Sequence, residues 1–503
     1  MAPEPELSET EFKLKTITET RATSPRWDRT RWDRTRWALA ALSLSMLMPS
    51  LDTSIANVAL PSLAQSFDAS FQDVQWIVLS YLLAITALIV GAGRLGDIIG
   101  RRRLLLVGIG LFTAASLFCG LAPTFWLLLV ARIAQGLGAA IMMALTVAMV
   151  GETVPKEKTG RVMGLLGTMS AIGTSFGPSL GGLLISGFGW RAIFLVNLPL
   201  GMLNLLLACR HLPADRREMK GGRARFDVIG MLLLALSLVA YALAMTTGAM
   251  TTGQGGFGPL NIALLSGAAI GGAAFVFAET KIASPLIRPA MMRERKLSTG
   301  LIMSGLVSTV MMATLVVGPF YLSYALMLDP AVLGLVMSAG PLVAALAGMP
   351  AGRLVDRCGA QRMTIMGLAG MTAGLVALVA LPGSFGVAGY VLPIVIVTAH
   401  YALFQAANNT ATMADIRADQ RGVISGMLNL SRNLGLVTGA SLMGAIFAAA
   451  STIGVHDVAA APDAVAAGMR ITFAVATALI VAALVTAIAG RGLPARRPVP
   501  DSL

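Results

Sequence analysis

Two charged residues, Asp52 and Arg132, lie inside long apolar stretches, and Asp52 is the only acidic residue deep within one. A lone charge there is costly unless it is paired or solvated, so both residues are candidates for function. A helical rise of about 1.5 Å per residue puts Arg132 roughly 10 Å and Asp52 roughly 13 Å from the same end of their helices. These depths predict that the charges pair or exchange partners, with Asp52 loading and releasing a proton. The alternative is that both make only structural hydrogen bonds.

Polar residues also recur at helical spacing in two apolar stretches of the C-terminal half. Such a stripe is expected to face a water-filled cavity rather than lipid, and we expect it to contact a small-molecule cargo. Hydrogen bonds between helices are the alternative. The candidate cavity residues are His400, Tyr401, Gln405, Asn408, Asn409, Asn429 and Arg432, together with Gln135 close to Arg132.

Glycines recur at every fourth position of GTSFGPSLGG, at Gly173, Gly177 and Gly181, accompanied by Pro178 and Gly182. Glycines at this spacing form one smooth helix face for close packing, and the proline predicts a kink. Both a gate and simple packing are compatible with this pattern. The stripe of small residues expected to oppose this face is Gly334, Ser338, Pro341, Ala345 and Gly348.

Two pairs of segments recur about half a chain apart. GRLGDIIGRRR (Gly93–Arg103) matches GRLVDRCGAQR (Gly352–Arg362), and Gly160–Gly182 matches Gly422–Gly444 at nearly the same separation. Two such matches indicate a duplicated unit, which in an apolar chain is typical of transporters with a site between the halves. In the first pair, glycines permit a tight turn and the acid can hold an arginine. The candidates for this switch loop, or latch, are Gly93, Asp97, Gly100, Arg101 and Asp356.

The chain has 503 residues, of which 56% are hydrophobic and 13% are charged. Soluble proteins carry about 25% charged residues, so the main solvent of this chain is lipid. The sequence therefore predicts an all-α integral membrane protein with fourteen spanning segments. These are 37–60, 75–95, 104–122, 125–150, 161–185, 191–209, 227–247, 260–278, 298–322, 332–353, 362–381, 388–413, 422–448 and 470–489.

The repeat divides these segments into two bundles of six helices with two helices inserted between them. The predicted regions are a basic tail (1–36), the first bundle (37–209), loops with the inserted helices (210–297), the second bundle (298–489) and a second tail (490–503). Lysine and arginine concentrate in both tails and in alternate loops, which predicts that both termini are cytoplasmic. The net charge of +13 therefore reflects membrane topology rather than nucleic acid binding.

The sequence lacks an ATP-binding GxxxxGK[ST] loop, and its cysteines and histidines are scattered without metal-ligand spacing. We therefore expect no cofactor and no metal, and a proton gradient as the energy source. A membrane sensor or enzyme is disfavoured, because no cluster of nucleophile and base stands out. We expect a monomer to suffice for function, and an accessory export partner stays open.

Five segments, in order, resemble the motifs of the fourteen-helix drug:proton antiporters of the major facilitator superfamily. They are LDTSIANVALP, GRLGDIIGRRR, the segment around Arg132, GTSFGPSLGG, and WRAIFLVNLPLG at 190–201. The resemblance implies two pseudo-symmetric bundles plus two inserted helices, alternating access by a rocking motion, and proton-driven export of amphipathic compounds. It also implies proton coupling through Asp52 and Arg132, and a multi-pass protein of the bacterial cytoplasmic membrane.

The second half departs from relatives that carry extra acids there, which are linked to divalent cationic drugs. Its spans contain no deep acid, since Asp415 lies only at a helix end. We therefore expect monovalent or neutral lipophilic cargo to be preferred over dications. Two alternatives stay open. One is a dedicated exporter of a single metabolite, antibiotic or siderophore, and the other is a proton-coupled uptake symporter, which the glycine–proline motif disfavours.

Overall fold

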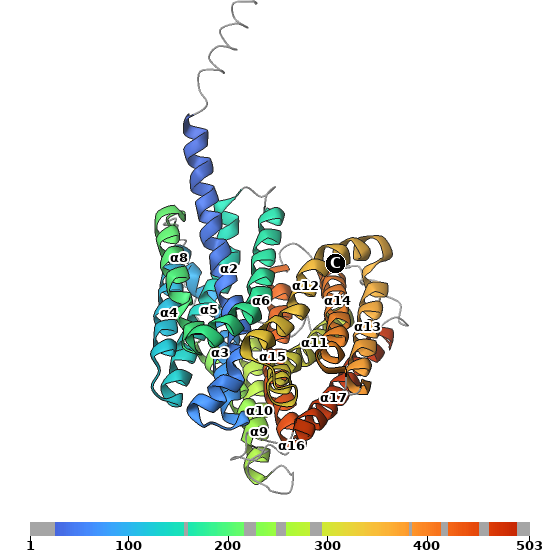
Figure 1. Cartoon of the computed structure of the whole chain (residues 1–503). Coiled ribbons are helices and arrows are strands. Elements are labelled where there is room, and N and C mark those ends of the chain that lie inside the picture. Colours follow the sequence, from blue (N-terminus) through green and yellow to red (C-terminus); the bar gives the residue numbers. More distant parts are fainter. Residues whose placement is uncertain are drawn as a thin grey trace, which may run out of the picture.

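A computed structural model describes residues 26–154, 159–215, 228–247, 258–281, 294–381, 385–413, 421–451 and 462–489 (Figure 1). Every regular element in these ranges is a helix. The elements are α2 (Arg26–Phe67), α3 (Phe71–Ile99), α4 (Arg101–Leu121), α5 (Phe125–Thr153), α6 (Thr159–Phe188), α7 (Ala192–Leu195), α8 (Asn197–His211), α9 (Val228–Thr247), α10 (Pro259–Lys281), α11 (Arg295–Phe320), η3 (Tyr321–Ala325), α12 (Pro330–Cys358), α13 (Ala360–Ala380), α14 (Gly386–Met413), α15 (Arg421–Thr438), η5 (Gly439–Met443), α16 (Gly444–Ala450) and α17 (Pro462–Ala489).

All fourteen predicted spans correspond to helices in the described part of the chain. Three of them are built from consecutive elements, namely α7 with α8, α11 with η3, and α15 with η5 and α16. Among the described residues, 13 helices are long and apolar enough to cross a membrane. The remaining span is α6, whose many glycine, serine and threonine residues lower its hydropathy. The predicted all-α membrane fold is therefore confirmed.

The first helix is longer than its predicted span. It begins at Arg26, inside the stretch predicted as a tail, and runs through Pro61 to Phe67. The helix therefore extends beyond both ends of the predicted span 37–60 and into the residues assigned to the basic tail. The next helix begins at a capping box, in which the Ser70 hydroxyl accepts from the Asp73 N–H and the Asp73 carboxylate accepts from the Ser70 N–H.

The two halves of the chain pack alike. Helix α2 packs against α6 as α11 packs against α15. Helices α3 and α4 pack against α5 as α12 and α13 pack against α14. This correspondence is what a duplicated unit predicts, and the two bundles lie side by side in Figure 1.

Repeat-related glycines have the same packing role in both halves. A Cβ on Gly173 of α6 would lie 2.6 Å from the Leu47 carbonyl oxygen of α2. A Cβ on Gly435 of α15 would collide with the Gly305 carbonyl oxygen of α11. Only glycine allows two helix backbones to approach this closely. The shared glycines therefore fix how the fifth span of each half packs on the first.

The duplicated motif forms the same turn twice. Gly100 separates α3 from α4 at φ +109°, and Gly359 separates α12 from α13 at φ +85°. Residues with a Cβ rarely adopt this conformation, so glycine suits both turns. The loop expected here is a single residue in each half. Asp97 and Arg101 consequently lie in the flanking helices rather than in a loop.

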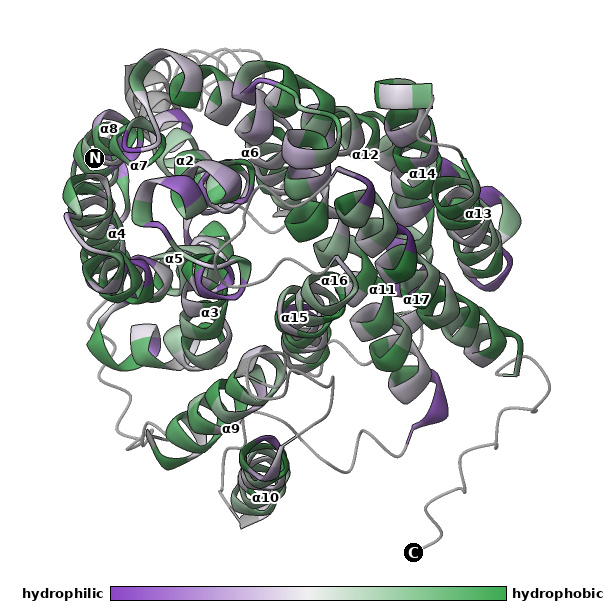
Figure 2. Ribbon diagram, turned by 60° about the horizontal axis from the view of Figure 1, so that its bottom comes forward, coloured by the Kyte–Doolittle hydropathy of each residue, from purple (hydrophilic) through white to green (hydrophobic). Residues whose placement is uncertain are grey.

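The two inserted helices lie outside both bundles. Helix α9 packs against α3, η5 and α16, whereas α10 packs mainly against α9. Only 11% of the most apolar window of α10 is buried inside the protein. Figure 2 shows α9 and α10 beside the bundles, with α10 the outermost. Lipid is the expected environment of the apolar surface of α10.

The spans alternate in direction, so each end of the molecule holds a fixed set of helix termini. The N-side is the end at which α2 begins, at the top of Figure 1, and the far side is the opposite end. Because the spans are even in number, α17 also ends on the N-side. The turns at Gly100 and Gly359 lie on the N-side, and the starts of α3 and α12 lie on the far side.

The two halves contact each other closely on the far side. Gly182 of α6 packs against Pro330 and Gly334 at the start of α12. Gly444 of α16 packs in the same way against Gln75 near the start of α3. Each contact joins the fifth span of one half to the second span of the other, so the internal repeat relates the two contacts.

Three phenylalanines add to the far-side contact. The ring centre of Phe71 of α3 lies 4.5 Å from that of Phe320 of α11 and 5.1 Å from that of Phe447 of α16. The rings of Phe71 and Phe320 are almost fully buried, and that of Phe447 is fully buried. Packed aromatic rings of this kind exclude water. The far side of the molecule is therefore closed in this conformation.

Candidate functional site

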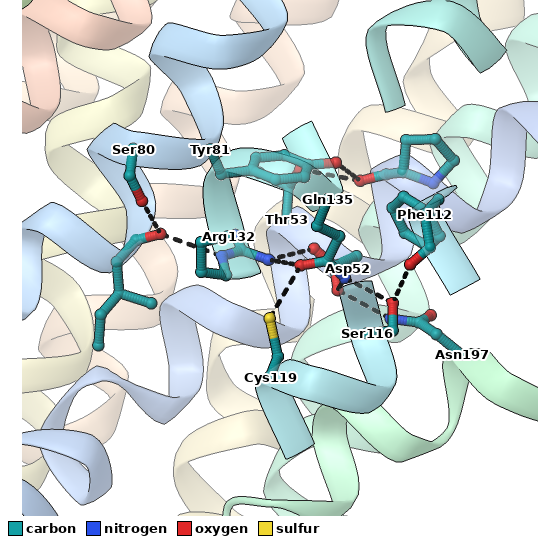
Figure 3. Close-up of polar contacts among 12 residues, drawn as sticks. Asp52, Thr53, Ser80, Tyr81, Phe112, Ser116, Cys119, Arg132, Gln135 and Asn197 are labelled. Carbon is teal, nitrogen blue, oxygen red and sulfur yellow. Dashed lines mark hydrogen bonds and ion pairs between the residues drawn. The ribbon is translucent and has the colours of Figure 1, made fainter. Parts of the chain in front are cut away.

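Asp52 and Arg132 form a buried ion pair in the N-terminal half (Figure 3). Arg132 Nη1 donates to Asp52 Oδ2 at 2.5 Å, and the arginine and aspartate side chains are 0% and 1% exposed. The two charges therefore pair, as their depths in the sequence indicate. Two charges removed from water need further hydrogen bonds to offset their desolvation.

The second carboxylate oxygen of Asp52 accepts from two amides. Gln135 Nε2 and Asn197 Nδ2 each donate to Asp52 Oδ1 at 2.8 Å. Together with Arg132, three side-chain donors surround one carboxylate. This arrangement fits the deprotonated form of Asp52, because a protonated carboxyl would place one more donor among donors.

Arg132 is held by more than its partner carboxylate. Nε donates to the Ile77 carbonyl oxygen at 3.0 Å, and Nη1 also donates to Gln135 Oε1 at 2.6 Å. The guanidinium carbon lies 4.2 Å from the centre of the Tyr81 ring. Nη2 has no hydrogen-bond partner among the described residues. Arg132 therefore keeps one donor group available for a new acceptor.

Glycines on α5 bring the neighbouring helices close enough for these contacts. A Cβ on Gly136 would lie 2.6 Å from the Tyr81 carbonyl oxygen of α3. A Cβ on Gly138 would lie 2.6 Å from the Phe112 nitrogen of α4. Side chains on α5 can thus reach α2, α3 and α4 at once.

Gln135 does not lie in a cavity, which corrects the expectation from the sequence. It is 0% exposed, and its amide bonds to Asp52, Arg132 and the Ser116 hydroxyl. The reason is helical geometry, because residues three apart share one face of a helix and Gln135 therefore faces the same way as Arg132.

A polar pocket lies in the C-terminal half, between α11, α14 and α15. Its volume is about 190 Å³. Because α14 ends at Met413 on the N-side and Met413 lines the pocket, the pocket extends toward that side. Its lining residues are Ser304, Val307, Ser308, Tyr401, Phe404, Gln405, Asn408, Asn409, Met413, Leu428, Asn429 and Arg432.

Six of the residues expected in a cavity line this pocket, and His400 does not. His400 Nδ1 lies 2.8 Å from the Ile396 carbonyl oxygen, and its ring packs beside Gly370 of α13. The expectation for His400 is therefore corrected. Its position on α14 directs the ring toward α13, whereas Tyr401 and Gln405, one helical turn apart, face the pocket.

The glycine face of α6 packs against α2 rather than α12. Gly173 and Gly177 approach α2 too closely for a Cβ, and Gly181 makes ordinary contact with Ile55 of α2. The hypothesis that the small residues of α12 oppose this face is therefore wrong.

Helix α12 contacts a different face of α6. Gly182 meets Gly334 there, and the Ser175 hydroxyl donates to the Pro341 carbonyl oxygen at 2.8 Å. The sequence correctly indicated that α6 and α12 pack together. However, one face of α6 packs on α2 and the adjacent face packs on α12. One helix thus links the Asp52 helix to the opposite bundle.

The duplicated motif forms ion pairs in the first half. Arg101 lies 2.8 Å from Asp97 and 2.8 Å from Glu152, which joins α3 and α4 to α5. Asp356, the counterpart of Asp97 in the second half, has no ion pair among the described residues. A Cβ on Gly93 would meet no atom within 4 Å, so packing does not require that glycine.

Sequence reasoning missed three residues that contact these groups. Asn197 binds Asp52, Glu152 binds Arg101, and Asp215 accepts from the backbone N–H groups of Arg102 and Arg103 at 2.8 and 3.3 Å. Asp215 thereby caps the start of α4. An amide within the apolar run of WRAIFLVNLPLG was a readable signal for Asn197. The partners of Glu152 and Asp215 depend on helix packing and leave no such signal.

Comparison with known proteins adds a family and a fold. The family model described as Major Facilitator Superfamily matches residues 42–318 and 297–502. A bacterial homolog of the human lysosomal transporter Spinster, solved in an inward-facing and occupied conformation, has a similar structure with a TM-score of 0.66 at 16% identity. That similarity covers 91% of this chain and 97% of the other.

Curated relatives include proteins named for drug resistance and for vitamin transport. The multidrug resistance protein Stp of Mycobacterium tuberculosis is 42% identical over 201 residues, which is 40% of this chain and only 37% of the relative. The riboflavin transporter RibZ of Clostridioides difficile is 28% identical over 82% of this chain and 88% of its own length. The uncharacterized transporter YebQ of Escherichia coli is 31% identical, over 86% and 95% respectively.

Proposed function

We propose that this chain, which belongs to the Major Facilitator Superfamily, is a proton-coupled antiporter that exports amphipathic small molecules. The family and the many apolar helices make it a multi-pass membrane transporter and not an enzyme. The observation that supports proton coupling is the buried ion pair of Asp52 and Arg132. The N-side is assigned to the bacterial cytoplasm, because the basic residues concentrate there.

Asp52 is proposed as the proton carrier. Protonation removes its charge and with it the attraction to Arg132, which then depends on Ile77, Gln135 and the Tyr81 ring. The carboxyl proton needs an acceptor, and Asn197 Oδ1 is buried without a partner among the described residues. Rotation of the Asn197 amide would let that oxygen accept the new O–H.

Helix α6 offers a mechanical link from Asp52 to the other half. It packs on α2 next to Asp52, with Ser50 and Ser170 hydroxyls 2.7 Å apart, and it contacts α12 through Gly182. A rearrangement around Asp52 therefore reaches the far-side contact. The closed far side and the pocket on the N-side support an inward-facing state, and export requires the reverse state.

A dedicated exporter of one compound is the second candidate. The small size and largely polar lining of the pocket favour it, and RibZ, which matches most of this chain, is named for one vitamin. An uptake symporter would use the same proton carrier with the opposite direction of cargo movement. The contacts at Asp52 are the same for antiport and for both alternatives. Transport measurements are therefore needed to distinguish them.

The test uses purified protein in liposomes with an imposed pH gradient and a panel of ethidium, fluorescein and riboflavin. Antiport predicts that cargo moves against the proton flux and that Asp52→Asn abolishes gradient-driven movement. Asp329→Asn is the matched control, since Asp329 starts α12 without a side-chain cap. Movement of cargo with the protons establishes symport. Transport that Asp52→Asn leaves intact contradicts the proton-carrier assignment.

A further inference from the structure

Arg432 places an unpaired positive charge inside the membrane-spanning part of the C-terminal half. It lines the polar pocket, and the described residues offer it no carboxylate within ion-pair distance. Helical rise puts it about 16 Å from the start of α15, farther than an arginine side chain reaches. The side chain is exposed at the pocket, so its charge is stabilised there by water or by an anion that enters the pocket.

The other polar groups of the pocket are uncharged. Gln405, Asn409 and Asn429 line it, and no hydrogen bond to another described residue is found for their side chains. Each amide brings two N–H donors. Asn408 differs, because its amide already donates to the Gly300 carbonyl oxygen at 3.1 Å. The pocket thus presents one cation beside uncharged amides that can donate to an anion, and its lining contains no acid.

The internal repeat argues that Arg432 is not a packing residue. The aligned position in the first half is Ser170, whose hydroxyl lies 2.7 Å from Ser50 of α2. Next to it, Gly173 and Gly435 keep the same packing role in both halves. Where the first half has a serine that packs between helices, the second half therefore has a long cation that lines a pocket.

We propose that this pocket binds the anionic group of an organic anion, with Arg432 holding a carboxylate or comparable group and Asn409, Asn429 and Gln405 donating around it. The inference rests on the proposed transport function and names its cargo class. Drug-sized sites measure about 300–1,000 Å³, so a pocket of about 190 Å³ accommodates the anionic group rather than a whole molecule. Asp52 does not oppose an anion here, because Arg132 neutralises it and the protein buries it.

The test compares two dyes that differ only in a carboxylate. Rhodamine 110 carries a free carboxylate, and rhodamine 123 is its methyl ester. Binding to purified protein in phosphatidylcholine nanodiscs is measured by fluorescence anisotropy, without any pH gradient. We expect rhodamine 110 to bind more tightly. A lost charge-assisted hydrogen bond corresponds to about 10-fold to 100-fold in affinity, so Arg432→Gln should weaken rhodamine 110 by about that factor and should not weaken rhodamine 123, which is a cation.

Two variants control for folding and for net charge. Arg432→Lys keeps the cation and should retain part of the preference, whereas Arg470→Gln removes an exposed arginine of α17 outside the pocket lining and should retain all of it. Equal binding of both dyes, preference for the ester, binding of neither, or a preference that Arg432→Gln leaves intact would each overturn the inference. Because binding needs no gradient, these outcomes do not depend on whether the chain is an antiporter.

A third arm separates cargo from lipid as the source of the anion. Nanodiscs that contain one-third phosphatidylglycerol supply an anionic headgroup at the same membrane. Retention of the rhodamine 110 preference there supports a soluble cargo. Loss of the preference would assign the pocket to a lipid headgroup and overturn the cargo assignment.

Discussion

The guanidinium of Arg132 has more N–H donors than the carboxylate of Asp52 has oxygens. Arg132 can therefore bind other acceptors while it pairs with Asp52. Its Nε and Nη1 bind Ile77 and Gln135 besides Asp52, while Nη2 has no partner among the described residues. The arginine therefore stays anchored when the carboxylate changes its charge. A site that must gain and lose a proton without collapsing needs such an anchor.

At the scale of single residues, we predict that the effects of substituting Asp52 and Arg132 on stability are strongly coupled. Removing one partner of a buried ion pair typically costs about 3–5 kcal/mol, because the other charge is left unpaired. Asp52→Asn and Arg132→Gln should each lower the melting temperature of the purified protein, because Asp52→Asn leaves the charge of Arg132 unpaired and Arg132→Gln leaves that of Asp52 unpaired. The double variant should be more stable than the sum of the two losses implies. Additive losses in melting temperature would contradict the coupling.

Among the elements, α6 has the strictest packing requirement. One face lies against α2 and an adjacent face against α12, and glycines form the closest contact on each. The Gly173 face controls how α6 sits on the helix that carries Asp52. Other glycines of α6, such as Gly167, face open space.

This difference predicts opposite effects for two substitutions on one helix. Gly173→Ala should destabilise by about 1–3 kcal/mol, because its Cβ would meet the Leu47 carbonyl oxygen at 2.6 Å and force α6 away from α2. Gly167→Ala should be neutral or stabilising, since alanine has the higher helix propensity. Melting temperatures in detergent compare the two. Equal behaviour of both variants would mean that the close contact is not required.

The start of α4 depends on a residue far away in the sequence. Asp215 caps it from the segment after α8, and a Cβ on Gly100 would lie 2.5 Å from the Asp215 carboxylate. Asp215→Ala should cost about 0.5–2 kcal/mol, the usual loss for a helix cap. Asp215→Asn should retain most stability, because the amide oxygen still accepts. A melting temperature unchanged in Asp215→Ala would exclude the cap as a stabilising contact.

In the whole molecule, two repeat-related contacts close the far side, one at Gly182 with Gly334 and one at Gly444 with Gln75. Opening the far side requires both contacts to separate. We therefore expect both contacts to stabilise the state with the closed far side relative to the state with the open far side. A side chain added to either contact disfavours the closed far side without touching Asp52 or the pocket.

We therefore predict that Gly182→Val shifts the population toward an open far side. Spin labels at Pro123 and Asp463, on exposed far-side positions of the two halves, report the separation after Cys209 and Cys358 are replaced by serine. The distance distribution should move to larger values. Gly187→Val on the same helix, where a Cβ meets nothing within 4 Å, should leave it unchanged. Identical distributions in both variants would contradict the gating role.

The sequence by itself determined the fold and the two charges in its first half. Apolar length, basic loops and a duplicated motif are local properties, so they predicted fourteen helices, two matching halves and the turns at Gly100 and Gly359. The depth of a residue along a helix also follows from the sequence, which is why pairing of Asp52 with Arg132 was predictable.

Only the tertiary structure decided which way each side chain faces and which partner it meets. Gln135 joins the Asp52 network, His400 turns to α13, and the Gly173 face of α6 packs on α2. Asp215 and Arg432 acquire their surroundings from helices distant in the chain. The physical reason is that a helix buried on several sides has no single apolar face, so its sequence gives spacing and depth while its rotation is set by the neighbours that pack against it.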